Sequence, residues 1–328
     1  MRLLICGGAG YIGAHIVKAC ANHHELMVLD NLSTGHRAAI KWGKFIQGDL
    51  NDPHCLNHIF KQYTIDAVIH VAAKSIVSES FQQPLAYYKN NINGTIQLLE
   101  TMQQHGCQQL VFSSSAAVYG TPVTDSISEH HPTQPINPYG HNKLAIEQLL
   151  DYCYHAYGIN SVSLRYFNAA GADPQGEIGE SHIPETHLIP NILRHSLPTV
   201  HSPNREPFKL YGVDHPTPDG TCIRDYVHVN DLADAHIKAL DYLQQQAGAH
   251  CFNLGNGAGF SVYEIIAASE QVTGQPLHYH IHAARQGDPA RLVANSEKAQ
   301  QHLAWQPQYR NIEQIIDTAW YWEQSRRY

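Results

Sequence analysis

The chain has 328 residues, of which 43% are hydrophobic and 15% are charged, so it is long enough to bury a sizeable core in one large or two smaller domains. A net charge of −8 and the lack of a Lys/Arg block argue against a nucleic-acid or membrane partner and favour a small-molecule ligand. The seven cysteines form no Cys-x-x-Cys pair and predict buried thiols in a reducing compartment.

The first predicted element is a buried strand at residues 3–6, followed by a glycine-rich turn and a helix. No signal-peptide core precedes this strand and no apolar run reaches membrane-spanning length, so we expect a cytoplasmic protein. Gly7, Gly10 and Gly13 allow a tight turn, close approach of a pyrophosphate to backbone amides, and close packing of helix on strand. The segment therefore predicts dinucleotide binding.

The second predicted strand, residues 26–29, ends at Asp30. A carboxylate at this place can accept hydrogen bonds from both ribose hydroxyls and repels a 2′-phosphate, so it favours NAD over NADP. Arg37 favours NADP instead, because its guanidinium could reach the 2′-phosphate. Asp49, after the next strand, is compatible with an adenine contact and equally with a turn or a helix N-cap.

Further predicted strands at residues 45–46, 67–71 and 110–112 alternate with helical patterns. This order is typical of a Rossmann-type, doubly wound parallel α/β sheet whose ligand lies across the carboxyl ends of the strands. We assign residues 1–168, plus a returning segment at about 225–245, to an NAD-binding domain. The remainder of 169–328, which is rich in Pro, Gly and His, is assigned to a smaller α/β domain that binds the substrate.

Two later segments carry the predicted chemistry. Tyr139 and Lys143 are one helical turn apart, so we expect them on one face of a helix. An ammonium beside a phenol lowers the pKa of the phenol by roughly 1–3 units, which would let Tyr139 accept a proton from a sugar hydroxyl. Ser115, after the strand at 110–112, could relay that proton. Taken alone, each feature also fits a chance pair on a solvated helix or a polar loop.

Together these motifs resemble the UDP-glucose 4-epimerases (UDP-galactose 4-epimerases) of the extended short-chain dehydrogenase/reductase family. The resemblance runs nearly end to end, through residues 7–13, 30–31, 90–95, 113–120, 139–143, 165–168, 219–229 and 287–289. It implies that Tyr139 removes the proton of the sugar 4-hydroxyl while C4 transfers hydride to tightly bound NAD, with Ser115 bridging the two oxygens and Lys143 holding the nicotinamide ribose. The 4-keto sugar would then turn over and regain the hydride, as in galactose metabolism.

The resemblance also implies ligand contacts. Cofactor contacts would be Gly7, Gly10, Tyr11, Ile12, Gly13, Asp30, Asn31, Leu32, Ser33, Thr34, Gly35, Asp49, Leu50, Val71, Ala72, Ala73, Lys74, Ser75, Asn90, Ser115, Tyr139, Lys143 and Phe167. Contacts with a UDP-hexose would be Ser115, Tyr139, Asn168, His187, Lys209, Leu210, Tyr211, Arg224, Arg285, Asp288 and Leu292. The guanidinium groups of Arg224 and Arg285 suit a diphosphate, although either could form a surface ion pair instead.

Three positions need comment against the family pattern. Ala117 stands where some members carry a small hydroxyl, while Ser115 and Tyr139 are retained. His187 stands where some epimerases have an Asn that contacts uridine diphosphate, so its role is open. Leu292 aligns beside the 2-substituent of the sugar, and Leu is smaller than Tyr, so UDP-GlcNAc and UDP-GalNAc are candidate substrates as well.

Other NAD-dependent UDP-sugar enzymes resemble the chain through the same motifs. A 4-epimerase of another sugar is one alternative; a 4,6-dehydratase or decarboxylase is another, but it would need an acidic residue where Ala116 and Ala117 stand. A non-catalytic NAD-binding protein is a third reading, and it could dispense with Tyr139, Lys143 and Ser115.

The alternation His278-x-His280-x-His282 would place imidazoles on one strand face, but no acidic or Cys partner is spaced nearby, so we predict no metal site. The helix at 143–157 has apolar residues around much of its circumference. With the helix after Pro84 it resembles a homodimer interface, and burial within one subunit is the alternative.

Overall fold

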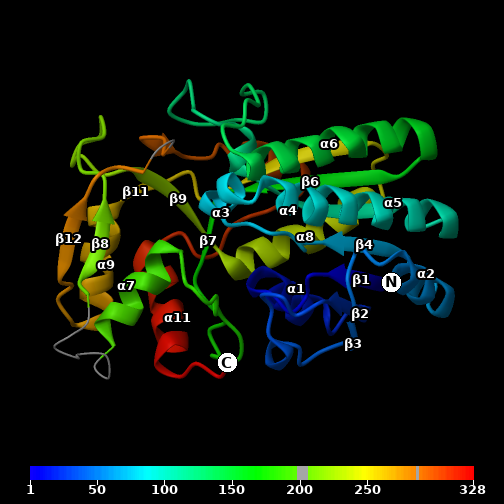
Figure 1. Cartoon of the computed structure of the whole chain (residues 1–328), viewed down its shortest axis with the longest axis horizontal. Helices are drawn as coiled ribbons and strands as arrows, with labels where there is room; N and C mark the ends of the chain where they lie inside the picture. Colours follow the sequence, from blue (N-terminus) through cyan, green and yellow to red (C-terminus); the bar gives the residue numbers. More distant parts are fainter. Residues whose placement is uncertain (198–205, 286–287) are drawn as a thin grey trace.

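A parallel sheet of seven strands forms the centre of the computed structural model in Figure 1. The structure describes residues 1–197, 206–285 and 288–328. The strand order is β10-β6-β5-β4-β1-β2-β3, and it reverses direction at β1, so the predicted Rossmann-type doubly wound sheet is confirmed. The strands are β1 (Arg2–Cys6), β2 (Glu25–Asp30), β3 (Lys44–Gln47), β4 (Ala67–His70), β5 (Gln109–Ser115), β6 (Asn160–Tyr166) and β10 (Ala249–Leu254).

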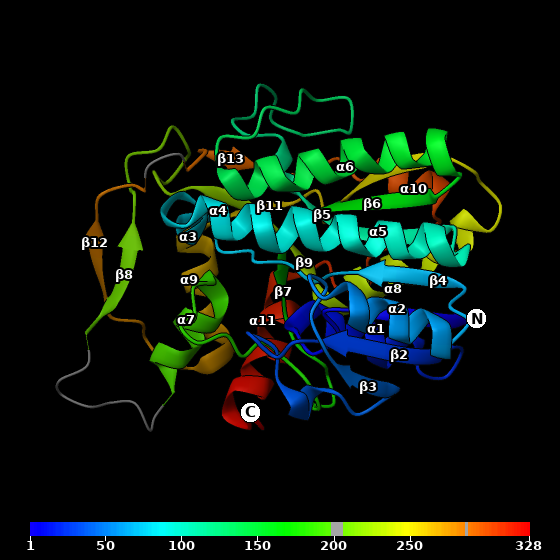
Figure 2. The same ribbon diagram turned by 45° about the vertical axis from the view of Figure 1, so that its right-hand side comes forward.

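Helices cover both faces of this sheet, which explains why the central strands β1 and β4 are buried along almost their whole length. Successive residues of β1 alternate between the faces: Leu3 and Ile5 belong to one core cluster, and Leu4 and Cys6 to another. The first cluster includes residues of α1 (Tyr11–Cys20) and α8 (Val229–Leu243), and the second includes residues of α2 (Pro53–Gln62), α5 (Gly94–His105) and α6 (Pro138–Tyr157). Figure 2 shows α5 and α6 side by side on their face.

The chain returns to this sheet after its excursion into the second half. α8 packs on α1, and β10 then pairs with β6 at the edge of the sheet. The returning segment therefore extends to residue 254, beyond the predicted end at about 245. The division of the chain into two domains stays a prediction.

The remaining elements form smaller sheets beside the large one. β9 (Ile223–His228) pairs parallel with β7 (Asn168–Ala170) and β13 (Arg291–Leu292), and antiparallel with β11 (Gly259–Ser261). β8 (Phe208–Tyr211) pairs parallel with β12 (Tyr279–His282). A third core cluster joins α7 (Leu188–Ser196), α9 (Val262–Thr273) and α11 (Ile312–Gln324). Short elements are α3 (Val77–Gln82), α4 (Pro84–Tyr87), a π-helical turn (Tyr88–Asn93) and α10 (Glu297–His302).

All seven cysteines are free thiols, and Cys55 and Cys251 are the two that are partly exposed. The expected buried thiols are thus confirmed for the other five. Within the described ranges, the helices lack the combination of length and apolar character that crossing a membrane requires.

Candidate active site

A cavity of about 1720 Å³ runs along the carboxyl ends of β1, β2, β4, β5 and β6 and continues between α7, β8 and β9. Pockets for one drug-sized ligand usually measure about 300–1,000 Å³, so this volume has room for two ligands. We name its two ends by their residues: the glycine-turn end contains Gly10 and Asp30, and the arginine end contains Arg224 and Arg285.

The cavity brings together nearly all of the predicted ligand contacts. Of the predicted cofactor and substrate residues, only Leu32 and Gly35 do not line it. Leu32 has a φ of 59°, and its side chain packs on the core beside α1. Its contact with Asp30 is a hydrogen bond from the Leu32 backbone N–H. Gly35 packs against Ala9, where an added Cβ would come within 2.8 Å of the Ala9 carbonyl carbon. Their contacts with the cofactor stay predictions.

The glycine turn fits a dinucleotide phosphate. A Cβ built on Gly13 would lie 2.1 Å from the carbonyl oxygen of Gly7, so only glycine allows α1 to start this close to β1. A Cβ on Gly10 would meet only that same oxygen, at 3.5 Å, so the surface of Gly10 is open towards the cavity. The first amides of α1 are unpaired within the helix and can bind an anion here.

Asp30 is fixed at the cavity wall by two backbone donors. Its Oδ2 accepts from the Ala9 N–H at 2.9 Å and its Oδ1 from the Leu32 N–H at 2.8 Å. Burial raises the pKa of Asp30, against the opposing effect of these two bonds. Arg37 instead lies 4.6 Å from the Phe45 ring centroid and donates to the carbonyl of Ile40, and it is not among the residues lining the cavity. This arrangement suits the ribose hydroxyls of NAD and offers no guanidinium for a 2′-phosphate.

Asp49 forms the predicted turn and also faces the cavity. Its Oδ1 accepts from the Asn51 N–H at 2.8 Å, which is a turn interaction, and its Oδ2 accepts from the Asn31 side chain at 2.8 Å. It also lines the cavity. The contact with adenine stays a prediction.

Ser115, Tyr139 and Lys143 meet where the two ends of the cavity join. Ser115 ends β5, and its hydroxyl shares a side-chain hydrogen bond with Tyr139. The Nζ of Lys143 lies 5.8 Å from the ring centroid of Tyr139 and donates to the Ser113 carbonyl at 2.6 Å. Asn137 caps α6 through the Gly140 N–H at 2.8 Å and so fixes the start of the helix that carries both side chains.

The predicted lowering of the Tyr139 pKa is wrong for the protein chain by itself. Only 8% of Tyr139 is exposed, and burial raises its pKa, with a further contribution from Tyr166 that the hydrogen bond from Ser115 opposes. Burial also lowers the pKa of Lys143 to about 7, against the opposing charge of Glu147. Loss of hydration therefore outweighs the attraction between phenolate and ammonium in this site.

Arg165 and Glu147 form a buried ion pair near Lys143 that was not predicted from the sequence. Arg165 donates through Nε to Glu147 at 3.0 Å and through Nη1 to the Tyr119 hydroxyl at 3.0 Å, while the Ser114 hydroxyl donates to Glu147. Glu147 follows Lys143 by one helical turn, a spacing that places these two side chains near each other but does not indicate the contact with Arg165. The pair fixes the first turns of α6 against β5 and β6.

Long side chains line the arginine end, and each has a protein partner. Arg224 donates to the Asp288 carboxylate and, at 2.8 Å, to the Ile223 carbonyl. The Arg285 guanidinium lies 4.3 Å from the ring centroid of Tyr211. Lys209 forms an ion pair with Glu206 at 2.6 Å. The ion-pair alternative considered for Arg224 is thus present, and its contact with a diphosphate remains a proposal.

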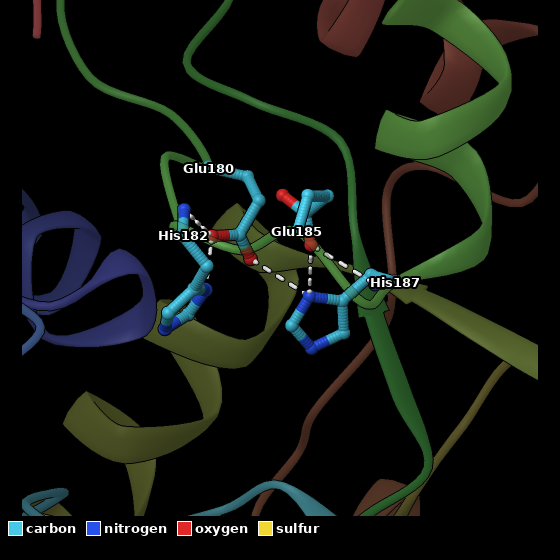
Figure 3. Close-up of side chains that lie close together, drawn as sticks. All are labelled: Glu180, His182, Glu185 and His187. Carbon is cyan, nitrogen blue, oxygen red and sulfur yellow. Dashed lines mark hydrogen bonds and ion pairs between the residues drawn. The ribbon is translucent and has the colours of Figure 1, made fainter. Parts of the chain in front are cut away.

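Four further side chains of this cavity form a compact group, which we name the Glu–His quartet (Figure 3). Their ligand atoms all lie within 4.8 Å of one another. Of these four residues only His187 was predicted as a ligand contact, and the spacing Glu-x-His-x-x-Glu-x-His is the sequence signal for the whole group. The members are Glu180, His182, Glu185 and His187.

Comparisons with known proteins agree with this geometry. The NAD dependent epimerase/dehydratase family matches residues 3–255. A UDP-glucose 4-epimerase of Halalkalibacterium halodurans is 50% identical over 326 residues, which cover 99% of this chain and 96% of that relative. A crystal structure of a UDP-glucose 4-epimerase matches with a TM-score of 0.95 and 47% identity over 99% of this chain and 98% of the other. The Brucella ovis enzyme in complex with NAD matches with a TM-score of 0.92 and 43% identity over 97% of each chain. The chain belongs to the NAD dependent epimerase/dehydratase family and, within it, to the UDP-glucose 4-epimerases.

Proposed function

We propose that this protein interconverts UDP-galactose and UDP-glucose by oxidising the sugar at C4 and reducing it again on the opposite face. The observation that carries the proposal is the meeting of Tyr139, Ser115 and Lys143 between the glycine-turn end and the arginine end of one cavity. When bound at the glycine-turn end, NAD supplies a hydride acceptor and donor, and its positive charge favours the phenolate form of a nearby tyrosine.

Ser115 and Tyr139 transfer the proton of the sugar 4-hydroxyl. The Ser115 hydroxyl is hydrogen-bonded to Tyr139, so it can pass a proton between the sugar 4-hydroxyl and the phenol oxygen in either direction. Tyr139 takes the proton when C4 becomes a ketone and returns it when C4 is reduced. Lys143 lies beside the same ring and stabilises the negative charge on the phenol oxygen.

Epimerisation requires that the nucleotide be bound firmly while the hexose remains free to rotate. Arg224 and Arg285 can bind the diphosphate bidentately, because a guanidinium fork matches phosphate oxygens. The hexose would then face Ala116, Ala117 and Leu292, whose short or apolar side chains hold it in no fixed orientation. A 4-keto sugar can therefore present either face to the same cofactor.

The rival dehydratase or decarboxylase reaction needs an acid or base beyond C4. Ala116 and Ala117, which immediately precede Val118, line the cavity and supply neither. A purely binding role would leave the hydrogen-bonded pair of Ser115 and Tyr139, and the nearby Lys143, without a purpose. Both readings are therefore less well supported than epimerisation.

The substrate range extends, in this proposal, to UDP-GlcNAc and UDP-GalNAc. Leu292 lines the cavity from β13, next to Arg224 on β9, and packs with the cluster that contains Phe167. A Leu at this position leaves more room beside the sugar than a Tyr would.

Assembly as a homodimer is part of the proposal. Large apolar or aromatic side chains of α4 and α6 are exposed, with Leu85 at 84% and Tyr152 at 70%. Two such elements can form a helical interface with their copies. Light scattering should give the mass of two chains, and Leu85→Arg combined with Tyr152→Glu should give the mass of one. A cytoplasmic location is likewise proposed, from the free cysteines.

The reaction is tested with the purified protein, UDP-galactose and no added dehydrogenase, by following both hexoses by proton NMR and NADH by absorbance. UDP-glucose that forms without stoichiometric NADH supports epimerisation. A keto-deoxy sugar, or NADH in proportion to substrate, would instead establish the dehydratase or a net dehydrogenase.

A further inference from the structure

The Glu–His quartet lies in the segment between β7 and α7, away from the residues assigned to proton transfer. Its histidines are presented by a short stretch of chain that ends at the N-cap of α7, which is His187. Figure 3 shows the two carboxylates facing the His187 ring, with dashed contacts joining the group. No step of the proposed epimerisation uses this arrangement.

The quartet is packed more tightly than solvated ion pairs. The side chains of Glu180 and Glu185 are 5% and 3% exposed. His187 Nδ1 lies 2.8 Å from Glu185 Oε1 and 3.6 Å from Glu180 Oε2. His182 Nδ1 is buried and pairs directly with Glu180 Oε1. The ring nitrogens and carboxylate oxygens therefore converge on one small volume.

These separations match the ligand shell of a metal ion. Nitrogen and oxygen ligands bind Zn²⁺ at about 2.0–2.2 Å, so two ligands of one tetrahedral ion lie about 3.4 Å apart. The quartet atoms lie within 4.8 Å of one another, so side-chain adjustments of about an ångström complete such a shell. Imidazole and carboxylate together are a donor set of transition metals rather than of Mg²⁺ or Ca²⁺.

The carboxylates are held in place by groups outside the quartet. Glu185 Oε1 accepts from the Thr186 and His187 N–H groups, each at 2.9 Å, and its Oε2 pairs with Arg194 at 3.1 Å. Glu180 Oε1 accepts from the Ser181 N–H at 2.9 Å. Such outer contacts orient metal ligands in advance and reduce the cost of binding.

Charge also favours a cation. With neutral imidazoles the quartet carries two buried negative charges, and Arg194 balances one of them. A divalent ion, or a pair of imidazolium protons, would supply the missing positive charge. The metal and the protons are therefore competing occupants of one site.

We propose that the Glu–His quartet binds one divalent transition metal ion of the zinc class as a closed, four-ligand structural site. Four protein ligands leave no open position for a substrate water, which distinguishes the site from a catalytic one. The ion ties residues 180–187 together at the wall of the cavity and thereby fixes the start of α7. Proton transfer at Tyr139 proceeds without it. The sequence analysis predicted no metal site anywhere in the chain, so the proposed ion at the Glu–His quartet departs from that expectation.

Cobalt provides the direct probe, because tetrahedral Co²⁺ absorbs strongly in the visible range. The untagged full-length protein is freed of metal with a chelator and titrated with Co²⁺, and bound metal is counted by mass spectrometry after gel filtration. We expect one Co²⁺ per chain with a tetrahedral spectrum that Zn²⁺ abolishes. Zn²⁺ in about a thousandfold excess over its Kd should raise the thermal midpoint by several degrees.

Two variants distinguish metal binding by the quartet from metal binding by surface histidines. His182→Asn removes one ligand and should weaken binding by more than the roughly 10–100-fold that the loss of an outer contact costs. The matched control is His280→Asn, which changes an exposed histidine of β12 and should bind as the parent protein does. If His182→Asn does not fold, Glu180→Gln removes a different ligand of the same site.

Equal Co²⁺ binding by the parent and by both ligand variants would overturn the proposal, as would an octahedral spectrum or no binding at all. In those cases the quartet is an ion-pair network held by protons. Because the readouts are metal content, spectrum and thermal midpoint, they do not depend on whether the protein epimerises UDP-galactose.

Discussion

The glycine-turn end and the arginine end of the cavity are lined by different kinds of group. The first consists of backbone and short side chains at the ends of buried strands, with Asp30 held by two backbone N–H groups. The second consists of long side chains from short strands and loops, such as Arg224 and Arg285, each of which contacts another protein side chain. The glycine-turn end is therefore preformed, whereas ligand binding at the arginine end must exchange existing contacts.

The junction between the two ends gives the largest expected effect. Tyr139→Phe should lower kcat for UDP-galactose by on the order of 10²–10⁴, because it removes the group that accepts and returns the proton. The content of bound NAD should stay unchanged. Tyr152→Phe, at an exposed position of the same helix, is the matched control and should keep full activity. A Tyr139→Phe enzyme within tenfold of the parent would remove Tyr139 from the mechanism.

At the glycine-turn end, two alanine substitutions separate packing from binding. Gly13→Ala places a Cβ 2.1 Å from a backbone oxygen and should cost about 1–3 kcal/mol or more in the free energy of unfolding. Gly10→Ala meets no atom closer than 3.5 Å, so it should fold normally but bind NAD more weakly. Urea denaturation and NAD titration measure the two effects, and equal stability losses in both variants would contradict the account.

At the arginine end, Arg224→Ala should raise KM for UDP-galactose about 10–100-fold, since a charge-assisted bond to phosphate contributes about 1.5–3 kcal/mol. Its effect on NAD content should be small. Arg291→Ala, on the adjacent strand β13 and outside the cavity lining, is the matched control. An unchanged KM in Arg224→Ala would assign this guanidinium to its ion pair with Asp288 alone.

Substrate range at the same end depends on the size of residue 292. Leu292→Tyr should lower kcat/KM for UDP-GlcNAc by about tenfold or more, while UDP-glucose turnover changes little. Steady-state rates on both substrates measure the ratio. If the variant keeps its activity on the N-acetylated sugar, the space at this position does not set the range.

Burial of Lys143 predicts a pH dependence of stability rather than a change in turnover. Its pKa is about 7 in the folded protein, below the ordinary value of 10.5. Between pH 7 and 10.5 Lys143 binds a proton in the unfolded chain but not in the folded protein. The free energy of unfolding therefore rises with pH in this range, by up to about 1.4 kcal/mol per pH unit. Below pH 7 Lys143 is protonated in both states, and the full destabilisation from the buried ammonium is present. Lys143→Met should abolish this rise in urea denaturation of the NAD-free protein between pH 7 and 9. Lys61→Met, at an exposed position of α2, is the surface control.

The sequence predicted the glycine-turn end better because its signals are local. Gly13 and Asp30 follow directly from the strand, turn and helix in which they lie. The packing of Leu32 and Gly35 against the core was not predictable in this way, because a sequence position in a binding loop does not reveal whether a residue faces the ligand or the core.

Contacts between distant segments could not be predicted in the same way. Arg165 reaches Glu147 only because β6 packs against α6, and β10 joins the large sheet only after a long excursion of the chain. The partners of Glu180 and Glu185 depend on how the segment before α7 folds back on itself. The predicted lowering of the Tyr139 pKa failed for a related reason, since spacing indicates neighbours but not burial.

The fate of the hydrogen at C4 tests the proposed hydride transfer most directly. UDP-galactose carrying deuterium at C4 is incubated with the enzyme in ordinary water, and the UDP-glucose product is analysed by mass spectrometry and NMR. If the hydride leaves C4 and returns within one closed site, the product keeps its deuterium at C4. Loss of that deuterium to the solvent would contradict the account, because the hydrogen would then have moved as an exchangeable proton.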